Sequence, residues 1–382
     1  MRARRLDEIP GFGIDKVADA AGEDPDVLRL ENLDIDIPPP PGVIEATRDA
    51  IGKDEYNSYL PFSGRTDLKE AVADHVDRRS GVRYDPASEI VITSGEADNL
   101  LDVLLATTDP GDEVVLTDPT YAGMINRVRL AGAVPRFVPH VVEGGVWRLD
   151  LDALRAIINE RTRALFVMSA SFPTGAVFDP AEWEALTSTA REHDLHIIYW
   201  ALMEGFVFDG REILHPASFP SMRDRVITVG SVSLEYRMIG WRVGWIVADS
   251  ETADAAGVVH VYNSVVAGGF GQAGAVVALQ SPPDDFRAAV EELERRHDAM
   301  MQQLKGLPAV AAEGGCSLLL NTEAMGIDPQ AASARLLEHN VAATPMTVWG
   351  ESVAPQHVRL VFSNEPVERI ELLGERLRRA LT

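Results

Sequence analysis

The sequence predicts an α/β fold with a mostly parallel, seven-stranded sheet in a large domain and a smaller α+β domain beside it. Between residues 90 and 247, short runs rich in β-branched residues alternate with helical stretches. This alternation is typical of parallel strands joined by right-handed helical crossovers. From about Asp284 the alternation ends, and a long amphipathic helix begins. A chain of 382 residues is long enough for two such lobes.

The N-terminal segment is expected to form an arm rather than a folded layer. Residues 1–44 are polar and rich in proline, and they include four successive prolines from Pro38 to Pro41. Such a run cannot lie inside a helix or a central strand, because proline lacks the N–H that both require. The arm is expected to lead into a helix at about Val43–Ile51.

The large domain is expected to span residues 45–283. Its strands are predicted at Ile90–Thr93, Glu113–Thr117, Pro135–Val138, Ala164–Met168, His196–Trp200, Val226–Val229 and Val243–Val247. Helices are predicted between most of them, at Ala97–Thr107, Gly123–Ala131, Leu151–Ile158 and Pro180–His193. No full helix separates the last two strands, so that pair is expected to be antiparallel.

The small domain is expected to combine residues 284–382 with the arm, residues 1–44. Asp285–Leu304 is predicted to be its long helix. The shorter elements are expected at Cys316–Leu320 (strand), Asp328–Leu337 (helix), His357–Phe362 (strand) and Pro366–Leu381 (helix).

Composition narrows the choice of partners and location. The net charge of −24 excludes nucleic acid and an anionic membrane surface, because both would repel this chain. Cys316 is the single cysteine, so no internal disulfide forms. No apolar run reaches membrane-spanning length, and none follows the basic N-terminal residues. We therefore expect a cytoplasmic protein with a small-molecule partner and no metal site.

One stretch, from Gly230 to Trp245, carries a family signature. Five of its residues fit the pattern Ser-x-Ser-Lys followed by Gly-x-Arg-x-Gly, namely Ser231, Ser233, Gly240, Arg242 and Gly244. The stretch resembles the cofactor-lysine segment of the class I/II aminotransferases, fold type I enzymes that use pyridoxal phosphate (PLP). Further segments resemble the family in the same order along the chain: Tyr59–Leu68, Thr93–Gly95, Pro110–Val114, Asp118–Tyr121, Phe172–Gly175 and His357–Leu360. The resemblance implies an aspartate-aminotransferase-like fold.

The resemblance also implies roles for individual residues. Tyr59 would reach the cofactor phosphate of a partner subunit, so a homodimer is expected. The turn Thr93–Gly95 would cradle the phosphate at a helix N-terminus, where N–H groups attract anions. Tyr121 would stack on the pyridine ring, and Arg359 would hold a substrate carboxylate through paired hydrogen bonds.

The departures from the family pattern all fall where the cofactor ring would lie. Leu234 stands at the position of the lysine that forms the Schiff base. Trp200, Met203 and Phe172 stand where the family has the aspartate, tyrosine and asparagine that bond the ring. Each lost bond to a buried polar group costs roughly 1–3 kcal/mol. We therefore expect a degenerate family member with no cofactor.

Two further observations support that expectation. The chain has only four lysines, Lys16, Lys53, Lys69 and Lys305, and the pattern places none of them near Leu234. Glu96 directly follows the phosphate turn, and its carboxylate would repel a phosphate if it pointed inward.

The resulting hypothesis is an enzyme that works without PLP. An aromatic and aliphatic box is expected to form from Tyr121, Phe172, Trp200, Met203 and Leu234, with polar edges from Ser231, Ser233, Arg242 and Arg359. Such a cavity is the usual form of a small-molecule site. We expect acid/base chemistry, such as cyclisation, condensation or elimination, on a small, partly apolar anion of specialised metabolism. The candidate acid/base residues are Glu96, Glu235, Tyr236 and Tyr59.

Two alternatives remain open at the level of the sequence. The protein could bind PLP or pyridoxamine phosphate (PMP) without a covalent link, as an atypical aminotransferase-like enzyme. It could also be a non-catalytic binding or regulatory pseudoenzyme.

Overall fold

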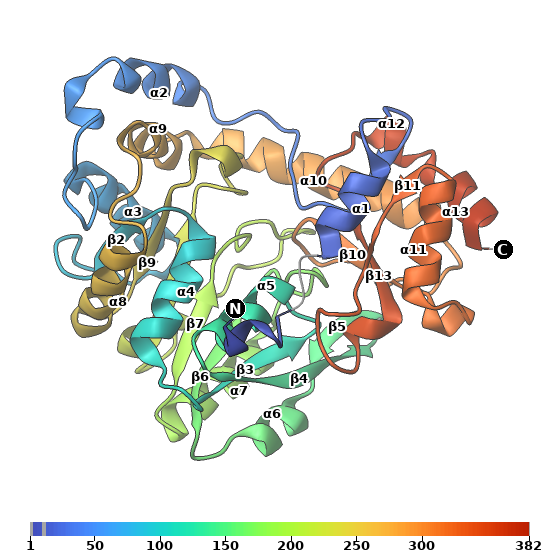
Figure 1. Ribbon diagram of the computed structural model, residues 1–382, viewed down its shortest axis with the longest axis horizontal. Helices are drawn as coiled ribbons and strands as arrows, with labels where there is room; N and C mark the ends of the chain where they lie inside the picture. Colours follow the sequence, from blue (N-terminus) through green and yellow to red (C-terminus); the bar gives the residue numbers. More distant parts are fainter. Residues whose placement is uncertain (1–2, 10–12, 382) are drawn as a thin grey trace.

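The structure is a computed structural model that describes residues 3–9 and 13–381 (Figure 1). Residues 1–2, 10–12 and 382, which belong to the ranges expected for the arm and the small domain, lie outside the described residues.

The main sheet has eight strands in the order β2-β9-β8-β7-β6-β3-β4-β5. Their bounds are β2 Ile90–Thr93, β3 Glu113–Asp118, β4 Val134–Glu143, β5 Val146–Leu149, β6 Thr162–Val167, β7 His196–Trp200, β8 Val226–Ser231 and β9 Gly244–Val247. Neighbours from β8 through β4 pair in parallel, whereas β9 is antiparallel to β8 and β2. The mostly parallel sheet and its antiparallel pair are therefore confirmed.

The prediction of seven strands is short by one. The missed strand, β5, pairs antiparallel with β4, which extends to Glu143. Gly144 and Gly145 join the two strands, and both have positive φ angles of 59° and 88°. Glycine adopts such angles without steric cost, which allows the tight hairpin.

Helices cover both faces of this sheet, as expected for parallel strands joined by crossovers (Figure 1). Their bounds are α3 Thr66–Ser80, α4 Glu96–Thr107, α5 Ala122–Leu130, α6 Leu151–Ile157, α7 Pro180–Glu192, α8 Ser250–Asn263 and α9 Gly269–Leu279. The start of α7 shows how the sequence fixes an element. Asp179 caps it, and Pro180 occupies its first turn. The Glu182 carboxylate accepts a hydrogen bond from the Asp179 N–H at 2.8 Å.

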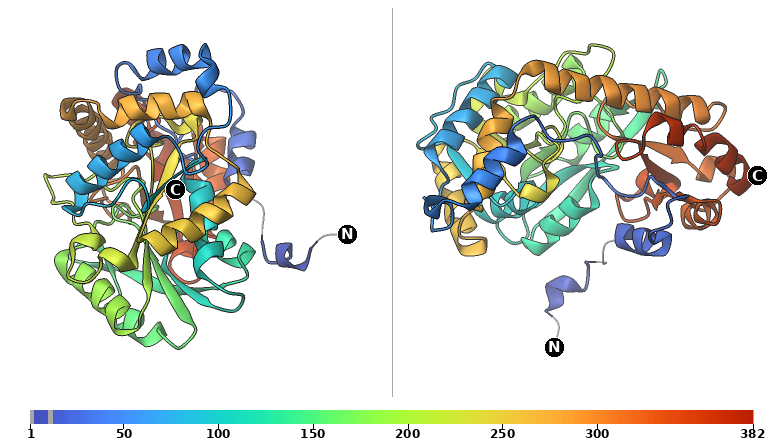
Figure 2. Two further views of the ribbon diagram at one scale, coloured as in Figure 1. Left: turned by 90° about the vertical axis from the view of Figure 1, so that its left-hand side faces the viewer. Right: turned by 90° about the horizontal axis from the view of Figure 1, so that it is seen from above.

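The C-terminal part forms a second, smaller sheet with helices around it. The three-stranded sheet has the order β10-β13-β12, with β10 Ser317–Asn321, β13 His357–Val361 and β12 Thr344–Pro345. The helices are α10 Pro283–Gln303, α11 Pro329–Glu338, α12 Val367–Ile370 and α13 Leu373–Leu381. The long helix α10 runs from the side of the main sheet to the smaller sheet (Figure 2).

The N-terminal arm returns to this smaller part. After α1 (Gly13–Ala21), the strand β1 (Leu28–Arg29) pairs in parallel with β11 (Val341–Ala342). The arm then crosses to α2 (Val43–Ile51), which lies beside α9 (Figure 1). Single 3-10 turns occur at Arg4–Leu6, Asp54–Tyr56, Pro216–Ser218, Arg223–Arg225, Ile239–Trp241, Glu323–Met325 and Ala354–Gln356. Within the described ranges, no helix is both long and apolar enough to cross a membrane.

Candidate functional site

A cavity of about 240 Å³ lies beyond the carboxyl ends of the central strands. Trp200 ends β7, while Ser233 and Leu234 follow β8. The cavity is lined by Asn32, Leu33, Glu96, Ala97, Tyr121, Phe172, Trp200, Leu202, Ser233, Leu234, Ile239 and Arg359. In doubly wound α/β sheets, ligands bind in crevices at this edge. The cavity is therefore the candidate site, and it draws residues from the arm, the main sheet and the smaller sheet.

Aromatic rings form one side of the cavity. The ring of Tyr121 lies 5.1 Å from that of Trp200 and 6.2 Å from that of Phe172. Trp200 is buried, and its indole Nε1 has no hydrogen-bond partner among the described residues. Leu202 and Leu234, both buried, add aliphatic surface. This side of the cavity suits a flat or apolar group, with one indole N–H left to pair with an acceptor.

Arg359 supplies a positive charge to this largely apolar cavity. The side chain is 0% exposed, and its guanidinium lies beside two adjacent rings, 4.9 Å from the centroid of Phe172 and 4.6 Å from that of Trp349. Nη2 donates to the Glu31 carbonyl and to Thr344 Oγ1, whereas Nε and Nη1 have no partner in the described chain. Burial lowers the pKa of Arg359 to about 9. An unpaired buried cation is costly, so the cavity is suited to an anion such as a carboxylate.

Trp349, which sequence reasoning missed, is fixed in place by Asp118 at the end of β3. The buried Asp118 carboxylate accepts bonds from the N–H groups of Glu351, Ser352, Val353 and Ala354 at 2.6–3.1 Å, and from Ser352 Oγ at 2.9 Å. The Trp349 carbonyl accepts from the Thr120 N–H at 2.8 Å. A Cβ on Gly350 would collide with Asp118. Gly350 was the only sign of this contact in the sequence, because a residue without a side chain allows Asp118 to come close to the backbone.

The head of helix α4 forms the polar end of the cavity. Glu96, its first residue, accepts a bond from Ser233 Oγ at 2.8 Å, and the Ser233 N–H donates to Ser231 Oγ at 3.1 Å. The exposed Arg242 lies beside Gly95, since a Cβ on that glycine would collide with the guanidinium. The three residues expected to bind an anion here are thus together, and the Glu96 carboxylate points toward them.

None of the four lysines lines the cavity. Lys16, Lys53 and Lys305 are exposed. Lys69 is buried, and its Nζ donates to the Ala87 carbonyl at 3.1 Å. The cavity therefore offers no amine that could bind an aldehyde covalently.

Six candidate residues lie outside the lining of the cavity, and two of them, Ser231 and Arg242, lie near the head of α4. Met203 is buried near Gly315, at 3.7 Å from the Cβ position of that glycine. Tyr59 is 80% exposed on the surface. Glu235 and Tyr236 follow Leu234 in sequence, but both are buried in a separate cluster behind the cavity wall.

That cluster places two carboxylates around one arginine. Arg79 Nη2 lies 3.0 Å from Glu235 Oε2, and Arg79 Nε lies 3.6 Å from Glu204 Oε1. Glu204 also lies 3.2 Å from the Tyr199 hydroxyl and 3.8 Å from His75 Nε2, and the Tyr236 hydroxyl contacts His75 Nδ1 at 3.1 Å. Burial raises the pKa of Glu204 to about 7 and also raises the pKa of Glu235. Burial lowers the pKa of His75, so this histidine is neutral near pH 7.

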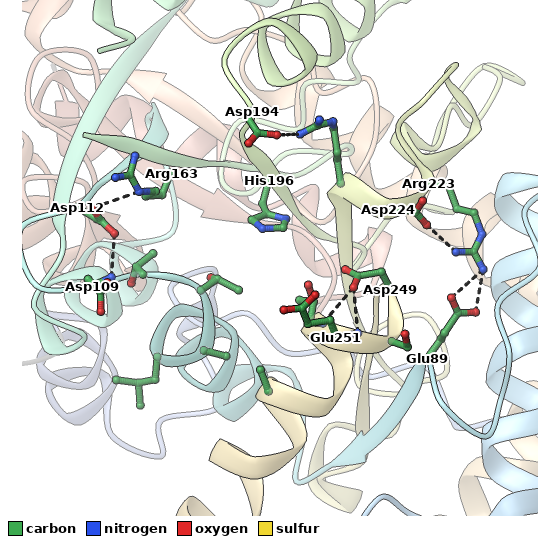
Figure 3. Close-up of a pocket in the computed structure, with 18 of the residues that line it drawn as sticks. Glu89, Asp109, Asp112, Arg163, Asp194, His196, Arg223, Asp224, Asp249 and Glu251 are labelled. Atoms are coloured by element: carbon green, nitrogen blue, oxygen red, sulfur yellow. Dashed lines mark hydrogen bonds and ion pairs between the residues drawn. The ribbon is translucent and has the colours of Figure 1, made fainter. Parts of the chain in front are cut away.

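A larger depression, of about 1250 Å³, lies at the opposite edge of the main sheet (Figure 3). Its acidic side chains are largely paired with arginines, as in Arg223–Glu89 at 2.8 Å and Arg225–Asp194 at 2.6 Å. In the part of the chain that the structure describes, no three His, Cys, Asp or Glu side chains are grouped as a metal site requires. The charges of this groove are therefore mostly satisfied within the protein.

The comparisons with known proteins agree with the fold. The family model for aminotransferase class I and II matches residues 25–377. The chain belongs to this family. Among its relatives, the arginine–pyruvate transaminase AruH of Pseudomonas aeruginosa is 32% identical over 374 residues, covering 93% of this chain and 92% of the relative. The probable N-succinyldiaminopimelate aminotransferase DapC of Mycobacterium tuberculosis is 31% identical over 357 residues, covering 88% and 90%.

Solved aminotransferases also share the whole fold. The aspartate aminotransferase from Thermus thermophilus with maleate matches at a TM-score of 0.91 and 30% identity, and the match covers 100% of both chains. The N-succinyldiaminopimelate aminotransferase from Mycobacterium tuberculosis matches at a TM-score of 0.93 and 29% identity, covering 100% of this chain and 99% of that one. The expected aspartate-aminotransferase-like fold is thus confirmed.

These relatives overturn the predicted chemistry. The hypothesis of a PLP-independent enzyme with no cofactor is wrong, because relatives along almost the whole chain are named transaminases or aminotransferases. The class I and II aminotransferases use PLP. The prediction gave too much weight to the positions that bond the cofactor ring in the family, which are Leu234, Trp200, Met203 and Phe172 in this chain. It gave too little weight to the positions that match the family's motifs, among them Ser231, Ser233, Arg242 and Tyr121.

The described residues fit PLP in part. The N-terminus of α4 lies beside Arg242 and Ser233, which could hold a phosphate, and the rings of Tyr121 and Trp200 line the cavity where a flat ring could bind. A covalent link does not fit, because no lysine lines the cavity. The geometry thus fits a cofactor held only by non-covalent contacts.

Proposed function

We propose that this protein is an aminotransferase-family enzyme that binds PLP or PMP without a covalent link and acts on a small amino or oxo acid. One observation carries the proposal. The cavity holds a fully buried arginine, Arg359, with two unpartnered nitrogens, and it is lined by no lysine. The first feature calls for a carboxylate ligand, and the second rules out a covalent cofactor in this cavity.

In this proposal the chain is a degenerate family member in which Leu234 takes the place of the Schiff-base lysine. Leu234 is buried, follows β8 and faces the cavity, which supports that assignment. PMP already carries the amino group that transamination transfers, so it needs no lysine for binding.

Residues at one end of the cavity would bind the substrate carboxylate, and residues at the other end would bind the cofactor phosphate. Arg359 would fix the carboxylate of the amino or oxo acid, since its planar guanidinium can donate two parallel bonds. Tyr121, Phe172 and Trp200 would exclude water and hold the flat ring. Ser231, Ser233 and Arg242 would bind the phosphate at the head of α4. A bound PLP-type cofactor supplies an electron sink for loss of the α-proton.

The names of the relatives support an amino acid and an oxo acid as substrates. They include an arginine–pyruvate transaminase, an aspartate aminotransferase and an aromatic-amino-acid aminotransferase. We further propose a cytoplasmic homodimer, in which Tyr59 of each subunit reaches the site of the other.

Spectroscopy and calorimetry with PLP and PMP test this proposal. The native protein should bind both ligands reversibly and lose them on gel filtration. Leu234→Lys should gain a visible absorption band that survives gel filtration, and borohydride should then fix an adduct on residue 234. Leu202→Lys serves as the matched control, because Leu202 is an equally buried leucine of the same cavity. It should give a weaker band or none.

Two results would overturn the proposal. One is a native protein that binds neither PLP nor PMP at millimolar concentration. The other is a borohydride adduct on Lys16, Lys53, Lys69 or Lys305 of the native protein, because a covalent cofactor would then exist outside the cavity.

A further inference from the structure

The anion position at the head of α4 already contains an anion of the protein itself. Glu96 Oε2 accepts the hydroxyl proton of Ser233 at 2.8 Å, and Glu96 lines the cavity. The Ser231 hydroxyl oxygen is engaged as well, since it accepts from the Ser233 N–H at 3.1 Å. Of the two serines proposed to bind a phosphate, Ser233 thus already donates its hydroxyl proton to a carboxylate, whereas Ser231 only accepts a bond.

The position favours a negative charge for physical reasons. The first N–H groups of a helix have no partner within the helix, and the helix dipole adds partial positive charge there. α4 has 12 residues and begins at Glu96 itself. Arg242 lies beside Gly95 and adds a full positive charge. A phosphate at this position would meet these attractions and the Ser233 hydroxyl, whose bond the Glu96 carboxylate now accepts at 2.8 Å.

At the other end of the cavity, buried hydrogen-bond donors lack partners, which indicates that a ligand binds there. Arg359 is 0% exposed and Trp200 is 4% exposed, and together they leave three buried nitrogens without partners: Arg359 Nε, Arg359 Nη1 and Trp200 Nε1. At the α4 end of the cavity the Ser233 hydroxyl is thus already bonded to Glu96, whereas at the Arg359 end three donors are unsatisfied. A ligand gains new bonds at the Arg359 end, whereas at the α4 end it must first displace a carboxylate.

We propose that Glu96 is an internal substitute for the phosphate, and that it determines how tightly this site holds phosphate-bearing ligands. Its carboxylate occupies the anion position when no phosphate is bound, and it leaves that position when a phosphate binds. Because the two anions repel each other and share Ser233, each phosphate binds against the competition of Glu96. The inference rests on the proposed function, since it explains how a cofactor without a covalent link would be held weakly enough to exchange.

Titration calorimetry with inorganic phosphate on the full chain tests this directly. Glu96→Gln keeps the size of the side chain and an acceptor for Ser233, but it removes the charge. It should tighten phosphate binding at least tenfold. Asp98→Asn is the matched control, because Asp98 lies in the same turn but accepts from Ser264 Oγ at 3.3 Å and does not line the cavity. Asp98→Asn should change the affinity less than threefold.

Other variants keep the result interpretable. Glu96→Ala removes the charge without adding a polar group, and it should also tighten phosphate binding. If Glu96→Gln fails to fold, Glu96→Ala gives the same measurement. The inference is overturned if the Glu96 variants bind phosphate no more tightly than Asp98→Asn, or more weakly than the native protein.

Titration with PMP separates this inference from the proposed function. If Glu96→Gln tightens inorganic phosphate while neither protein binds PMP, the proposed function fails and the role of Glu96 stands. If the native protein and Glu96→Gln bind both PMP and phosphate with equal affinity, the proposed function stands and the role of Glu96 fails.

Discussion

At the scale of single residues, Arg359 and Arg296 show what a buried guanidinium costs and how that cost is offset. Arg296 is 5% exposed, and it is paired with Asp36 at 2.6 Å and with Glu292 at 2.8 Å. Arg359 is more deeply buried, and it is held only by a carbonyl and a hydroxyl among the described residues. The buried Glu31 carboxylate favours the charged form of Arg359, but it forms its ion pair with Arg29 at 2.6 Å, so the Arg359 charge still destabilises the folded state. The cost is understandable if a bound carboxylate offsets it.

Substituting methionine for these two arginines should have opposite effects on stability. Arg359→Met removes an unpaired charge and should raise the free energy of unfolding of the ligand-free protein by about 1–3 kcal/mol. It should also weaken carboxylate binding by roughly a hundredfold, since truncating one partner of a buried charged pair costs about 2–5 kcal/mol. Arg296→Met leaves Asp36 without an ion-pair partner, whereas Glu292 keeps Arg295, so it should lower stability by about 1–3 kcal/mol. Urea denaturation and calorimetry measure both, and a destabilised Arg359→Met would contradict the argument.

The sequence predicted only part of the candidate site at the residue level. The structure brings Tyr121, Phe172, Trp200 and Leu234 to one cavity, from segments that family motifs had marked. Trp349 lies in no segment that matches a family motif. Its position depends on the bonds that Asp118 accepts from residues more than 230 positions away, which the sequence alone does not show. Sequence adjacency misled the choice of Glu235. The chain turns after Leu234, so the next side chain points to Arg79 instead of into the cavity.

At the scale of elements, the cluster around Arg79 joins helix α3 to the loops that follow β7 and β8. Arg79 and His75 come from α3, Glu204 follows β7, and Glu235 follows β8. One guanidinium faces two buried carboxylates, and the neighbouring histidine is neutral. A proton retained on Glu204 removes the repulsion between the carboxylates.

Stability should therefore depend on pH through Glu204. In the folded chain burial raises the pKa of Glu204 to about 7, whereas in the unfolded chain the carboxyl has its usual, lower pKa. Between these values the folded state retains a proton that the unfolded state releases. The contribution of Glu204 to the free energy of unfolding should thus fall as the pH rises from about 5 through 7, by on the order of 1–3 kcal/mol.

Glu204→Gln should remove this contribution, so its stability relative to the native protein should increase with pH and be higher at pH 8. Urea denaturation at several pH values measures the effect. Glu184→Gln is a suitable control, because Glu184 forms an exposed pair with Arg191 and should leave the slope unchanged. A native protein whose stability rises between pH 5 and 7 while Glu204→Gln keeps the same slope would contradict the assignment.

The fold was more predictable than the site because most elements are marked by local pattern. Each predicted strand of the main sheet appears within a few residues of its expected position, since β-branched runs and helical periodicity are local signals. The eighth strand, β5, was missed because its four residues follow a two-glycine hairpin and contain too few positions to show a period. The pairing of β1 with β11 depends on contacts across some 310 residues, which no local pattern encodes.

At the scale of the whole molecule, exposed apolar side chains gather on one side. Within the described chain, many of the large exposed ones belong to residues 44–62 and 258–270: Ile44, Ile51, Tyr59, Phe62, Val258, Tyr262, Val265 and Phe270. Phe62 and Val258 line one surface groove, and α2, α8 and α9 lie on the same side of the molecule (Figure 1). Apolar patches of this kind mark protein–protein interfaces. This surface supports the proposed homodimer.

A charged residue in this surface should separate the subunits. Tyr262 is 89% exposed, so Tyr262→Glu should leave the fold of the monomer intact and shift the protein from dimer to monomer by light scattering. Val142→Glu is the control, because Val142 is an exposed apolar residue on β4, at the other side of the sheet. A native protein that is monomeric at micromolar concentration would contradict the proposed dimer.

The bonds between Asp118 and residues 351–354 also have a consequence for the order in which the protein can mature. A ribosome releases the chain from its N-terminus, so β3 and Asp118 emerge long before the segment that carries Trp349 and Arg359. Until that segment emerges, the Asp118 carboxylate lacks the donors that satisfy it, and the cavity lacks its cation. The pocket can therefore be completed only near the end of translation. A nascent chain arrested before Trp349 should be unable to bind a carboxylate, however much of the main sheet has already formed.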